Sequence, residues 1–216
     1  MSKITINKLC FYYCDYYNPI FDNVNIALDT DWSLGLIGRN GRGKSTFLKL
    51  LTGKLKPVRG SIAMSVNMEY FPYEPDKKYT VAMDIVKENI GGLKTMEDKM
   101  EEIIAALDES RYNEYCEIQL RYSELGGYEM EGRILKEMAD MGLDEKLAYR
   151  EYSTLSGGER TRMMIIALFL RKNSFVLLDE PTNHLDMEGK EMVAEYLRKR
   201  KSFIVVSHDR DFLDAC

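Results

Sequence analysis

The fold is decided by the stretch Gly38-Arg39-Asn40-Gly41-Arg42-Gly43-Lys44-Ser45, which fits the pattern G-x-x-x-x-G-K-[ST] at every position. The apolar run Leu34-Gly35-Leu36-Ile37 comes directly before it and supplies the strand that such a loop must follow. The glycines allow the backbone to wrap a phosphate, so that several N–H groups and the positive end of the following helix face it. We expect Lys44 to reach the β- and γ-phosphates, the Ser45 hydroxyl to ligate Mg²⁺, and the amides as far as Thr46 to hold the triphosphate.

A glycine-rich turn that carries Lys44 and Ser45 by coincidence is the competing interpretation. At average residue frequencies the constrained positions coincide in only about one chain in a hundred of this size. The loop therefore predicts that the chain binds a nucleoside triphosphate.

The composition is that of one globular domain without a broad basic surface. The chain has 216 residues, of which 45% are hydrophobic, so it can bury one sizeable core. Its formal net charge of −5 argues against a general nucleic-acid binder. The cysteines at 10, 14, 116 and 216 lack metal-ligand spacing, which predicts a reduced, cytoplasmic compartment rather than a disulfide framework. No apolar run reaches about 18 residues, so we expect no direct membrane insertion.

The chain as far as residue 75 is predicted to form a β lobe with one helix. Residues 3–13 and 21–28 alternate polar and apolar side chains, which is typical of half-buried antiparallel strands leading to a buried strand at 33–37. A helix is expected over 44–53, and a strand pair over 62–71.

The next segment, 76–171, is predicted to be a helical lobe. Its apolar residues recur at the helical period in two stripes. These are Met96, Met100, Ile103, Ile104 and Leu107 in the first, and Ile134, Leu135, Met138 and Met141 in the second. The glycine pairs 91–92 and 126–127 are expected to break the helices.

From 172 to 216 the pattern returns to α/β. Short apolar strands at 175–178 and 203–206 are separated by a helix over 187–200, which predicts a mostly parallel sheet covered on both faces. We therefore expect a single domain, in which 172–216 joins residues 1–75 to complete the β lobe and the phosphate-loop core.

Two acidic residues follow the buried strand 175–178, at the edge of a parallel sheet where ligands usually bind. Successive side chains on an extended segment point in different directions. We therefore expect Asp179 to hold the Mg²⁺ hydration shell and Glu180 to face the water that attacks the γ-phosphate. Solvent-facing acids that cap a buried strand are the alternative. The phosphate loop in the same chain favours the metal and base roles.

A glycine pair opens the predicted helix 157–171, in the run Leu155-Ser156-Gly157-Gly158-Glu159. Ser156 with Glu159 three residues later is a capping box, which any helix can use. A capping box does not need two glycines, whereas Gly157 and Gly158 permit close approach of an anion to the positive helix end.

Several motifs, taken in order, resemble those of the nucleotide-binding domain of an ATP-binding cassette (ABC) protein. They are the phosphate loop, Leu-Ser-Gly-Gly-Glu at 155–159, Leu-Leu-Asp-Glu-Pro at 177–181, Asn-His-Leu-Asp at 183–186 and Ser-His-Asp at 207–209. The resemblance covers essentially the whole chain and implies a P-loop NTPase fold of ABC type that binds and hydrolyses ATP with Mg²⁺. Glu159 in place of the glutamine of transporter signatures, and Asn183-His184 in place of Ser-Ala, resemble the ABC-F subfamily.

ABC-F proteins are cytosolic and carry two such domains, and many act on the ribosome, some of them protecting it from antibiotics. The resemblance therefore implies a first cassette of an ABC-F protein, with the ribosome as a partner of the full-length chain. The chain ends at Cys216 soon after the last motif, so we expect a fragment of a longer two-cassette protein.

Further roles carry over by position. Tyr13 falls where the family has the aromatic residue that stacks on adenine, and its neighbours Tyr12, Tyr16 and Tyr17 could also take that role. His208 matches the switch histidine that senses the γ-phosphate.

The family also implies a partner domain. In ABC proteins the signature of one domain closes over the ATP of another, so Ser156, Gly157, Gly158 and Glu159 are implied to bind the nucleotide of a second ABC domain. Asp186 matches the loop that contacts this opposite domain. The arrangement is head to tail, within the full-length chain or as a homodimer, and full activity is expected to need the second cassette.

One residue departs from the family's pattern. Tyr73 stands where a glutamine normally senses metal and water, and Gln119, the single glutamine of the chain, lies in the helical lobe. Either Glu74 or a water substitutes for it, or the coupling between the helical lobe and the metal is altered. Two other functions stay open: the ATPase subunit of a membrane transporter, and a regulatory module that holds ATP without useful turnover.

The run Arg198-Lys199-Arg200-Lys201 suggests RNA binding at first sight. Cations are favoured at the C-terminal end of any helix, and this explanation is preferred.

Overall fold

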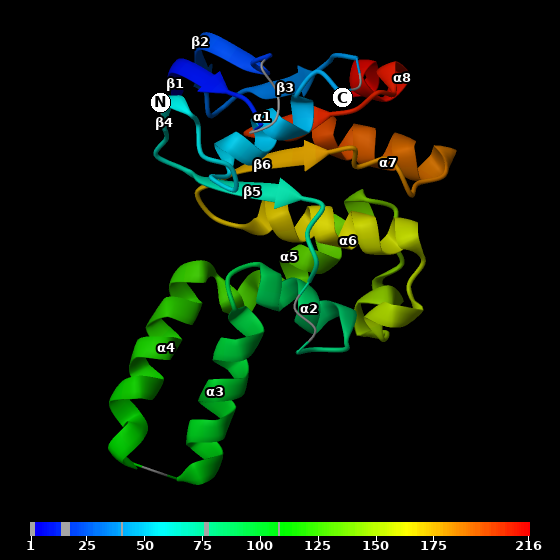
Figure 1. Ribbon diagram of the computed structural model, residues 1–216. Coiled ribbons are helices and arrows are strands. Elements are labelled where there is room, and N and C mark those ends of the chain that lie inside the picture. Colours follow the sequence, from blue (N-terminus) through cyan, green and yellow to red (C-terminus); the bar gives the residue numbers. More distant parts are fainter. Residues whose placement is uncertain (1–2, 14–17, 40, 76–77, 108) are drawn as a thin grey trace. The chain divides into compact units, whose positions relative to one another are not determined.

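The computed structural model describes residues 3–13, 18–39, 41–75, 78–107 and 109–216 (Figure 1). The chain divides into two compact units. The sheet unit comprises Met1–Tyr73 and Asn173–Cys216, and the helical unit comprises Glu74–Lys172. Among the described residues, no helix combines the length and the apolar character that crossing a membrane requires.

The first sheet of the sheet unit is antiparallel and has the order β2-β1-β4 (Figure 1). β1 spans Lys3–Phe11, β2 spans Phe21–Asp29 and β4 spans Arg59–Ala63. The alternation in β1 shifts at Lys8, whose φ of 48° interrupts the register between Ile6 and Leu9. Because of this bulge both apolar side chains point into the core, although they are three residues apart.

The second sheet is parallel and has the order β3-β7-β6-β5. Its strands are β3 Ser33–Leu36, β5 Asn67–Phe71, β6 Ser174–Asp179 and β7 Phe203–Val206. The central strands β6 and β7 are buried as predicted. β7 is followed by α8, Arg210–Ala215, which packs against α7, Met187–Arg198.

Two expectations about strands are corrected. The strand at 33–37 was expected to be buried, but β3 is an edge strand with alternating exposed and half-buried residues, and Ile37 beyond it is 63% exposed. The strand pair expected over 62–71 exists as two strands that do not pair with each other, because β4 joins the antiparallel sheet and β5 the parallel one.

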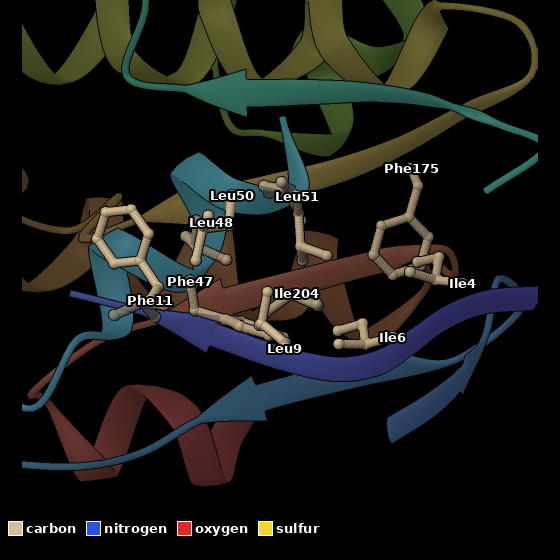
Figure 2. Packing of buried hydrophobic residues seen from close by; sticks show 12 residues of the cluster. Ile4, Ile6, Leu9, Phe11, Phe47, Leu48, Leu50, Leu51, Phe175 and Ile204 are labelled. Carbon is tan, nitrogen blue, oxygen red and sulfur yellow. The ribbon is translucent and has the colours of Figure 1, made fainter. Parts of the chain in front are cut away.

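Helix α1, Lys44–Leu51, connects the two sheets through their common core (Figure 2). The apolar residues of α1 meet side chains of β1, β6 and β7. The labelled members of this cluster are Ile4, Ile6, Leu9, Phe11, Phe47, Leu48, Leu50, Leu51, Phe175 and Ile204. Burial of each such side chain stabilises the fold by about 1.5–3 kcal/mol, so the start of α1 is firmly anchored under the phosphate loop.

The helical unit is built from five α-helices within its described residues. They are α2 Ala82–Asn89, α3 Leu93–Ala106, α4 Tyr112–Leu125, α5 Gly127–Asp140 and α6 Gly157–Leu170. Short 3-10 helices span Glu109–Arg111, Glu145–Tyr149 and Tyr152–Thr154. Gly126, with a φ of 77°, ends α4 and allows α5 to begin at the next residue, so this glycine pair breaks the helices as predicted.

The second predicted stripe is confirmed, since Ile134, Met138 and Met141 are buried. The first stripe is too wide: Ile103 is buried, but Ile104 is 58% and Leu107 88% exposed. Helix α4 packs against one side of α3, and the side of α3 that carries Ile104 faces solvent.

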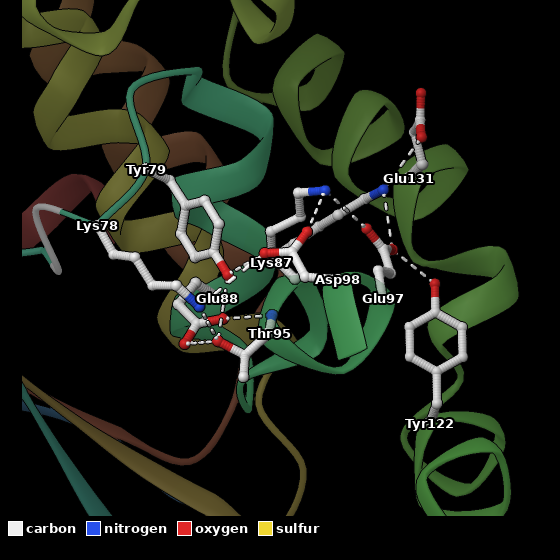
Figure 3. Close-up of polar contacts among 10 residues, drawn as sticks. Lys78, Tyr79, Lys87, Glu88, Thr95, Glu97, Asp98, Tyr122 and Glu131 are labelled. Carbon is white, nitrogen blue, oxygen red and sulfur yellow. Dashed lines mark hydrogen bonds and ion pairs between the residues drawn. The ribbon is translucent and has the colours of Figure 1, made fainter. Parts of the chain in front are cut away.

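A buried lysine organises the polar interior of the helical unit (Figure 3). Lys87 Nζ on α2 lies 3.2 Å from Glu97 Oε1 on α3 and 3.3 Å from Glu131 Oε2 on α5. The Tyr122 hydroxyl on α4 donates to the same Glu97 oxygen at 2.7 Å. A buried ammonium is tolerated only with such partners, so these contacts tie four helices together.

Candidate functional site

The phosphate loop connects the end of β3 to the start of α1, and two of its glycines have backbone conformations that other residues rarely adopt. Gly41 and Gly43 have φ values of 78° and 87°. A Cβ atom added at Gly43 would lie 2.4 Å from Ile20 Cγ2. Glycine at this position is therefore required by both conformation and space. Asn40 lies outside the described residues.

Lys44 is the first residue of α1, and its side chain turns back over the loop. Its Nζ donates to the Gly38 carbonyl at 2.7 Å and to the Arg39 carbonyl at 3.4 Å. The ammonium thus lies over the turn that precedes the helix. To bind a phosphate, it must exchange these carbonyls for phosphate oxygens.

A cavity of about 570 Å³ lies beside this loop in the sheet unit. It is lined by residues of the loop, of the strand ends and of the segment before β2. The lining residues are Tyr13, Ile20, Gly41, Gly43, Lys44, Ser45, Thr46, Asp179, Glu180, Asn183, Val206 and His208. Gly38, Arg39 and Arg42 belong to the loop but not to this lining. The cavity thus joins most of the predicted phosphate, metal and catalytic residues of the sheet unit, although these lie far apart in the chain.

The two acidic residues after the buried strand have different surroundings. Asp179 ends β6, and its Oδ2 accepts a hydrogen bond of 2.8 Å from the Tyr70 hydroxyl on β5. Burial, together with the adjacent Asp179 carboxylate, raises the pKa of Tyr70, so its phenol is protonated and donates. Tyr70 was missed by the sequence analysis, because its neighbour is known only once β5 is paired with β6.

Glu180 is not on an extended segment, contrary to the expectation. Its φ is 52°, in the left-handed region, while its amide still donates to the Val206 carbonyl at 2.8 Å. This turn directs the Glu180 side chain toward the end of β7. There its Oε2 lies 2.9 Å from His208 Nδ1 and accepts from the His208 amide at 3.4 Å. The structure therefore pairs the predicted base with the predicted switch histidine.

Tyr13 lines the cavity, whereas Tyr12 is not among its lining residues. The Tyr13 hydroxyl lies 3.3 Å from Thr46 Oγ1, and its ring meets Phe11 edge-on with centroids 5.0 Å apart. The side chain is nevertheless 42% exposed, which leaves ring surface for a ligand. Tyr16 and Tyr17, two further candidates for stacking on adenine, lie outside the described residues.

The residues expected to serve a second cassette cap helices. Ser156 Oγ accepts from the Glu159 amide at 3.2 Å, and Glu159 Oε2 accepts from the Ser156 amide at 2.6 Å, so the capping box is present at the start of α6 in the helical unit. Gly157 and Gly158 are the first residues of this helix. Asp186 caps α7, where its Oδ1 accepts from the Gly189 amide at 2.9 Å.

The basic run lies at the end of α7, as the helix-end explanation predicts. Lys199 is the C-cap residue, and its Nζ pairs with Glu195 Oε1 at 2.9 Å.

The donor set fits Mg²⁺. A serine hydroxyl and a carboxylate, Ser45 and Asp179, line the same cavity, and both supply the oxygen ligands that Mg²⁺ prefers. Within the described part of the chain, no group of three or more histidine, cysteine or acidic residues is arranged to hold a metal. A site with one carboxylate, completed by phosphate oxygens and water, is typical of Mg²⁺ and atypical of zinc.

Comparison with known proteins places the chain among ATP-binding proteins. The sequence profile described as "ABC transporter" matches residues 21–183. The chain is 31% identical over 228 residues to the tylosin resistance ATP-binding protein TlrC of Streptomyces fradiae, covering 99% of this chain and 41% of that protein. It is also 31% identical over 213 residues to ATP-binding cassette sub-family F member 3 of Mus musculus, covering 97% and 25%. The chain thus spans less than half the length of these curated relatives.

A solved structure shows the same fold. The crystal structure of the archaeal ribosome recycling factor aABCE1 with the ribosomal stalk protein aP1 matches 100% of this chain and 35% of that chain, with a TM-score of 0.65 and 24% identity. At this identity the likeness concerns the fold alone. The predicted α/β fold of ABC type, with its antiparallel β lobe, parallel sheet and helices, is confirmed.

Proposed function

We propose, because the chain belongs to the ABC transporter family, that it binds and hydrolyses MgATP as the first cassette of a cytoplasmic ABC-F protein that acts on the ribosome. Membership of this family supports ATP hydrolysis in general. We add to it the identity of the catalytic groups, the second cassette and the ribosome.

The observation that carries the proposal is the cavity of the sheet unit. Lys44 and Ser45 from the phosphate loop, Asp179 and Glu180 from the end of β6, and His208 after β7 all line it. Its volume of about 570 Å³ is within the range of about 300–1,000 Å³ usual for sites that take a molecule of nucleotide size. A phosphate grip, a metal carboxylate and a general base are the parts that phosphoryl transfer to water requires.

In this proposal each side chain has one task. Lys44 exchanges its loop carbonyls for oxygens of the β- and γ-phosphates, and the ring of Tyr13 stacks on adenine. Ser45 and Asp179 would hold Mg²⁺, which would supply neutralising charge to the phosphates. Glu180 takes a proton from the attacking water, while the contact with His208 holds its carboxylate in place.

The partners follow from the signature and from the relatives. Ser156, Gly157, Gly158 and Glu159 stand at a helix N-terminus, where backbone amides and the helix dipole favour a phosphate. We propose that they bind the nucleotide of a second cassette arranged head to tail, with Asp186 contacting that cassette. Similarity to a sub-family F member and to an antibiotic resistance protein supports the ABC-F assignment. The ribosome as partner is what membership of that subfamily implies.

Two rival functions make different predictions. The ATPase subunit of a membrane transporter would hydrolyse ATP but would not bind ribosomes, and Asn183-His184 argues against it. A regulatory module would bind ATP with negligible turnover. Tyr73 in the place of the usual glutamine favours a test of this function.

The test is Glu180→Gln in the full-length protein that contains this cassette. Loss of a general base is expected to lower ATP turnover by about 100-fold or more, with little change in the affinity for a nonhydrolysable ATP analogue. Co-sedimentation with ribosomes in the presence of ATP is expected to increase, because the ATP-bound form is trapped. Glu188→Gln, an exposed acid in the first turn of α7, is the matched control and should change neither measurement.

Each outcome addresses one part of the proposal. Full turnover in Glu180→Gln would remove the catalytic assignment. Normal turnover of the wild type without any ribosome co-sedimentation would favour the transporter subunit, and ATP binding without turnover would favour the regulatory module.

A further inference from the structure

We propose that Tyr70 is a positioning residue for the metal carboxylate: its hydroxyl holds Oδ2 of Asp179 and leaves Oδ1 for the metal or a water bound to it. This inference rests on the proposed function, which assigns Asp179 to Mg²⁺. The carboxylate at the end of a strand can otherwise rotate about its last side-chain bond. A fixed donor on one oxygen removes that freedom.

The contact follows from the register of two parallel strands. Tyr70 on β5 is paired with Leu177 on β6, and Phe71 with Leu178. Asp179 is two residues beyond Leu177, so it projects from the same face of the sheet. Tyr70 and Asp179 are therefore diagonal neighbours on adjacent strands, within reach of an aromatic side chain.

The chemistry of the pair is that of a donor and an ionised acceptor. The Tyr70 hydroxyl donates to Asp179 Oδ2 at 2.8 Å in a partly buried setting. A hydrogen bond to a charged oxygen is stronger than one between neutral groups and prefers a defined direction. The interaction is therefore suited to holding the carboxylate in one orientation.

The ring that carries the hydroxyl is itself held. Tyr70 packs against the core cluster that includes residues of α1 and β6. On the ring, the Lys54 ammonium lies 4.4 Å from the centroid. Packing and this cation–π contact together restrict the ring, so the hydroxyl meets Asp179 without a large loss of side-chain entropy.

Tyr70→Phe keeps the ring and removes only the hydroxyl. Partners that orient metal ligands typically contribute about 10–100-fold to metal affinity, and we expect the lower end here because the hydroxyl contacts one of two oxygens. The effect belongs to the metal, so the affinity for nucleotide without metal is expected to stay within about twofold.

The experiment measures Mn²⁺ binding, as a paramagnetic substitute for Mg²⁺, by electron paramagnetic resonance. The protein is saturated with a nonhydrolysable ATP analogue and titrated with Mn²⁺. We expect Tyr70→Phe to raise the Mn²⁺ dissociation constant about tenfold. Tyr122→Phe is the matched control, since it removes a hydroxyl that donates to Glu97 at 2.7 Å in the helical unit, and it should leave Mn²⁺ binding unchanged.

A second variant guards against a loss of folding in Tyr70→Phe. Lys54 is exposed, and Lys54→Met should preserve the fold while removing the cation–π contact with the Tyr70 ring, weakening Mn²⁺ binding by about twofold. An unchanged Mn²⁺ dissociation constant in folded Tyr70→Phe would overturn the inference, as would an unchanged constant in Lys54→Met if Tyr70→Phe does not fold. Failure of the wild type to bind the analogue at all would instead overturn the proposed function.

Discussion

Replacing Gly43 by alanine tests whether the phosphate loop is shaped by the segment packed behind it. The residue has a φ of 87°, which costs a non-glycine residue roughly 1–2 kcal/mol. The added Cβ would also lie 2.4 Å from Ile20 Cγ2 and 3.2 Å from Phe21 Cζ. Forcing a methyl group into such a site costs about 1–3 kcal/mol more. The expected destabilisation is therefore about 2–5 kcal/mol.

Gly41 provides a matched control in the same loop. Its φ of 78° is similar, but an added Cβ would meet nothing within 4 Å. Gly41→Ala should therefore cost only the conformational term of roughly 1–2 kcal/mol. The difference between the two variants isolates the contacts with Ile20 and Phe21.

Urea unfolding followed by fluorescence measures both changes. Trp32 is the single tryptophan of the chain and lies in the sheet unit, so its emission reports the unfolding of this unit. With a slope of about 2 kcal/mol per M, a loss of about 3 kcal/mol lowers the urea midpoint by about 1.5 M. Gly41→Ala should shift the midpoint by about half as much.

A double variant identifies the group responsible for the clash. In the Gly43→Ala background, Ile20→Ala removes the atom that the new Cβ meets. The loss of unfolding free energy caused by Ile20→Ala should therefore be smaller in this background than in the wild type, by about 1 kcal/mol or more. Equal midpoint shifts for Gly41→Ala and Gly43→Ala, together with additive effects of Ile20→Ala, would refute the steric argument.

Two further predictions concern a cation of the site and an acid of the helical unit. Lys44→Ala should weaken binding of a nonhydrolysable ATP analogue, measured by calorimetry, by about tenfold or more, because charged hydrogen bonds to phosphate are lost; an unchanged affinity would count against the phosphate loop. The hydrogen bond from Tyr149, with the nearby Lys87 ammonium, lowers the pKa of Glu131 below its usual 4.5. The ionised Glu131 carboxylate therefore stabilises the fold above pH 4.5, and this stabilisation is lost as the pH falls through the lowered pKa. The difference in unfolding free energy between wild type and Glu131→Gln should therefore be larger at about pH 6 than at about pH 3. It should stay below about 1 kcal/mol, because the Glu131 side chain is partly exposed. An equal difference at both pH values would contradict the assignment.

Short sequence patterns predict those parts of the site that depend on residues adjacent in the chain. The phosphate loop, the buried strands that end at Asp179 and Val206, and the capping box at Ser156 were all readable from short patterns. Non-local features were not. The separation of β4 from β5 and the edge position of β3 depend on which strands pair, and strand pairing leaves no trace in the period of one segment.

The same limit applied to two features of the site chemistry. Glu180 adopts a left-handed turn instead of the extended conformation that was expected after the strand, and its carboxylate contacts His208. The hydrogen bond from Tyr70 to Asp179 requires the register of β5 against β6, although the two residues are 109 positions apart in the chain. Both features lie where a ligand would be bound, which is where local rules are most often broken.

The structural and functional interpretations of the signature serine need not exclude each other. A hydroxyl has one proton to donate and two lone pairs to accept, and the capping bond from the Glu159 amide uses a lone pair of Ser156 Oγ. The proton of Ser156 is therefore left for an acceptor such as a phosphate oxygen of the nucleotide bound by a second cassette. Asp186 is similar, since the Gly189 amide uses Oδ1 and leaves Oδ2 for another contact. If Ser156 serves both purposes, Ser156→Ala should destabilise α6 by about 1 kcal/mol and also weaken ATP-dependent pairing of cassettes, whereas a purely structural serine would affect the first alone.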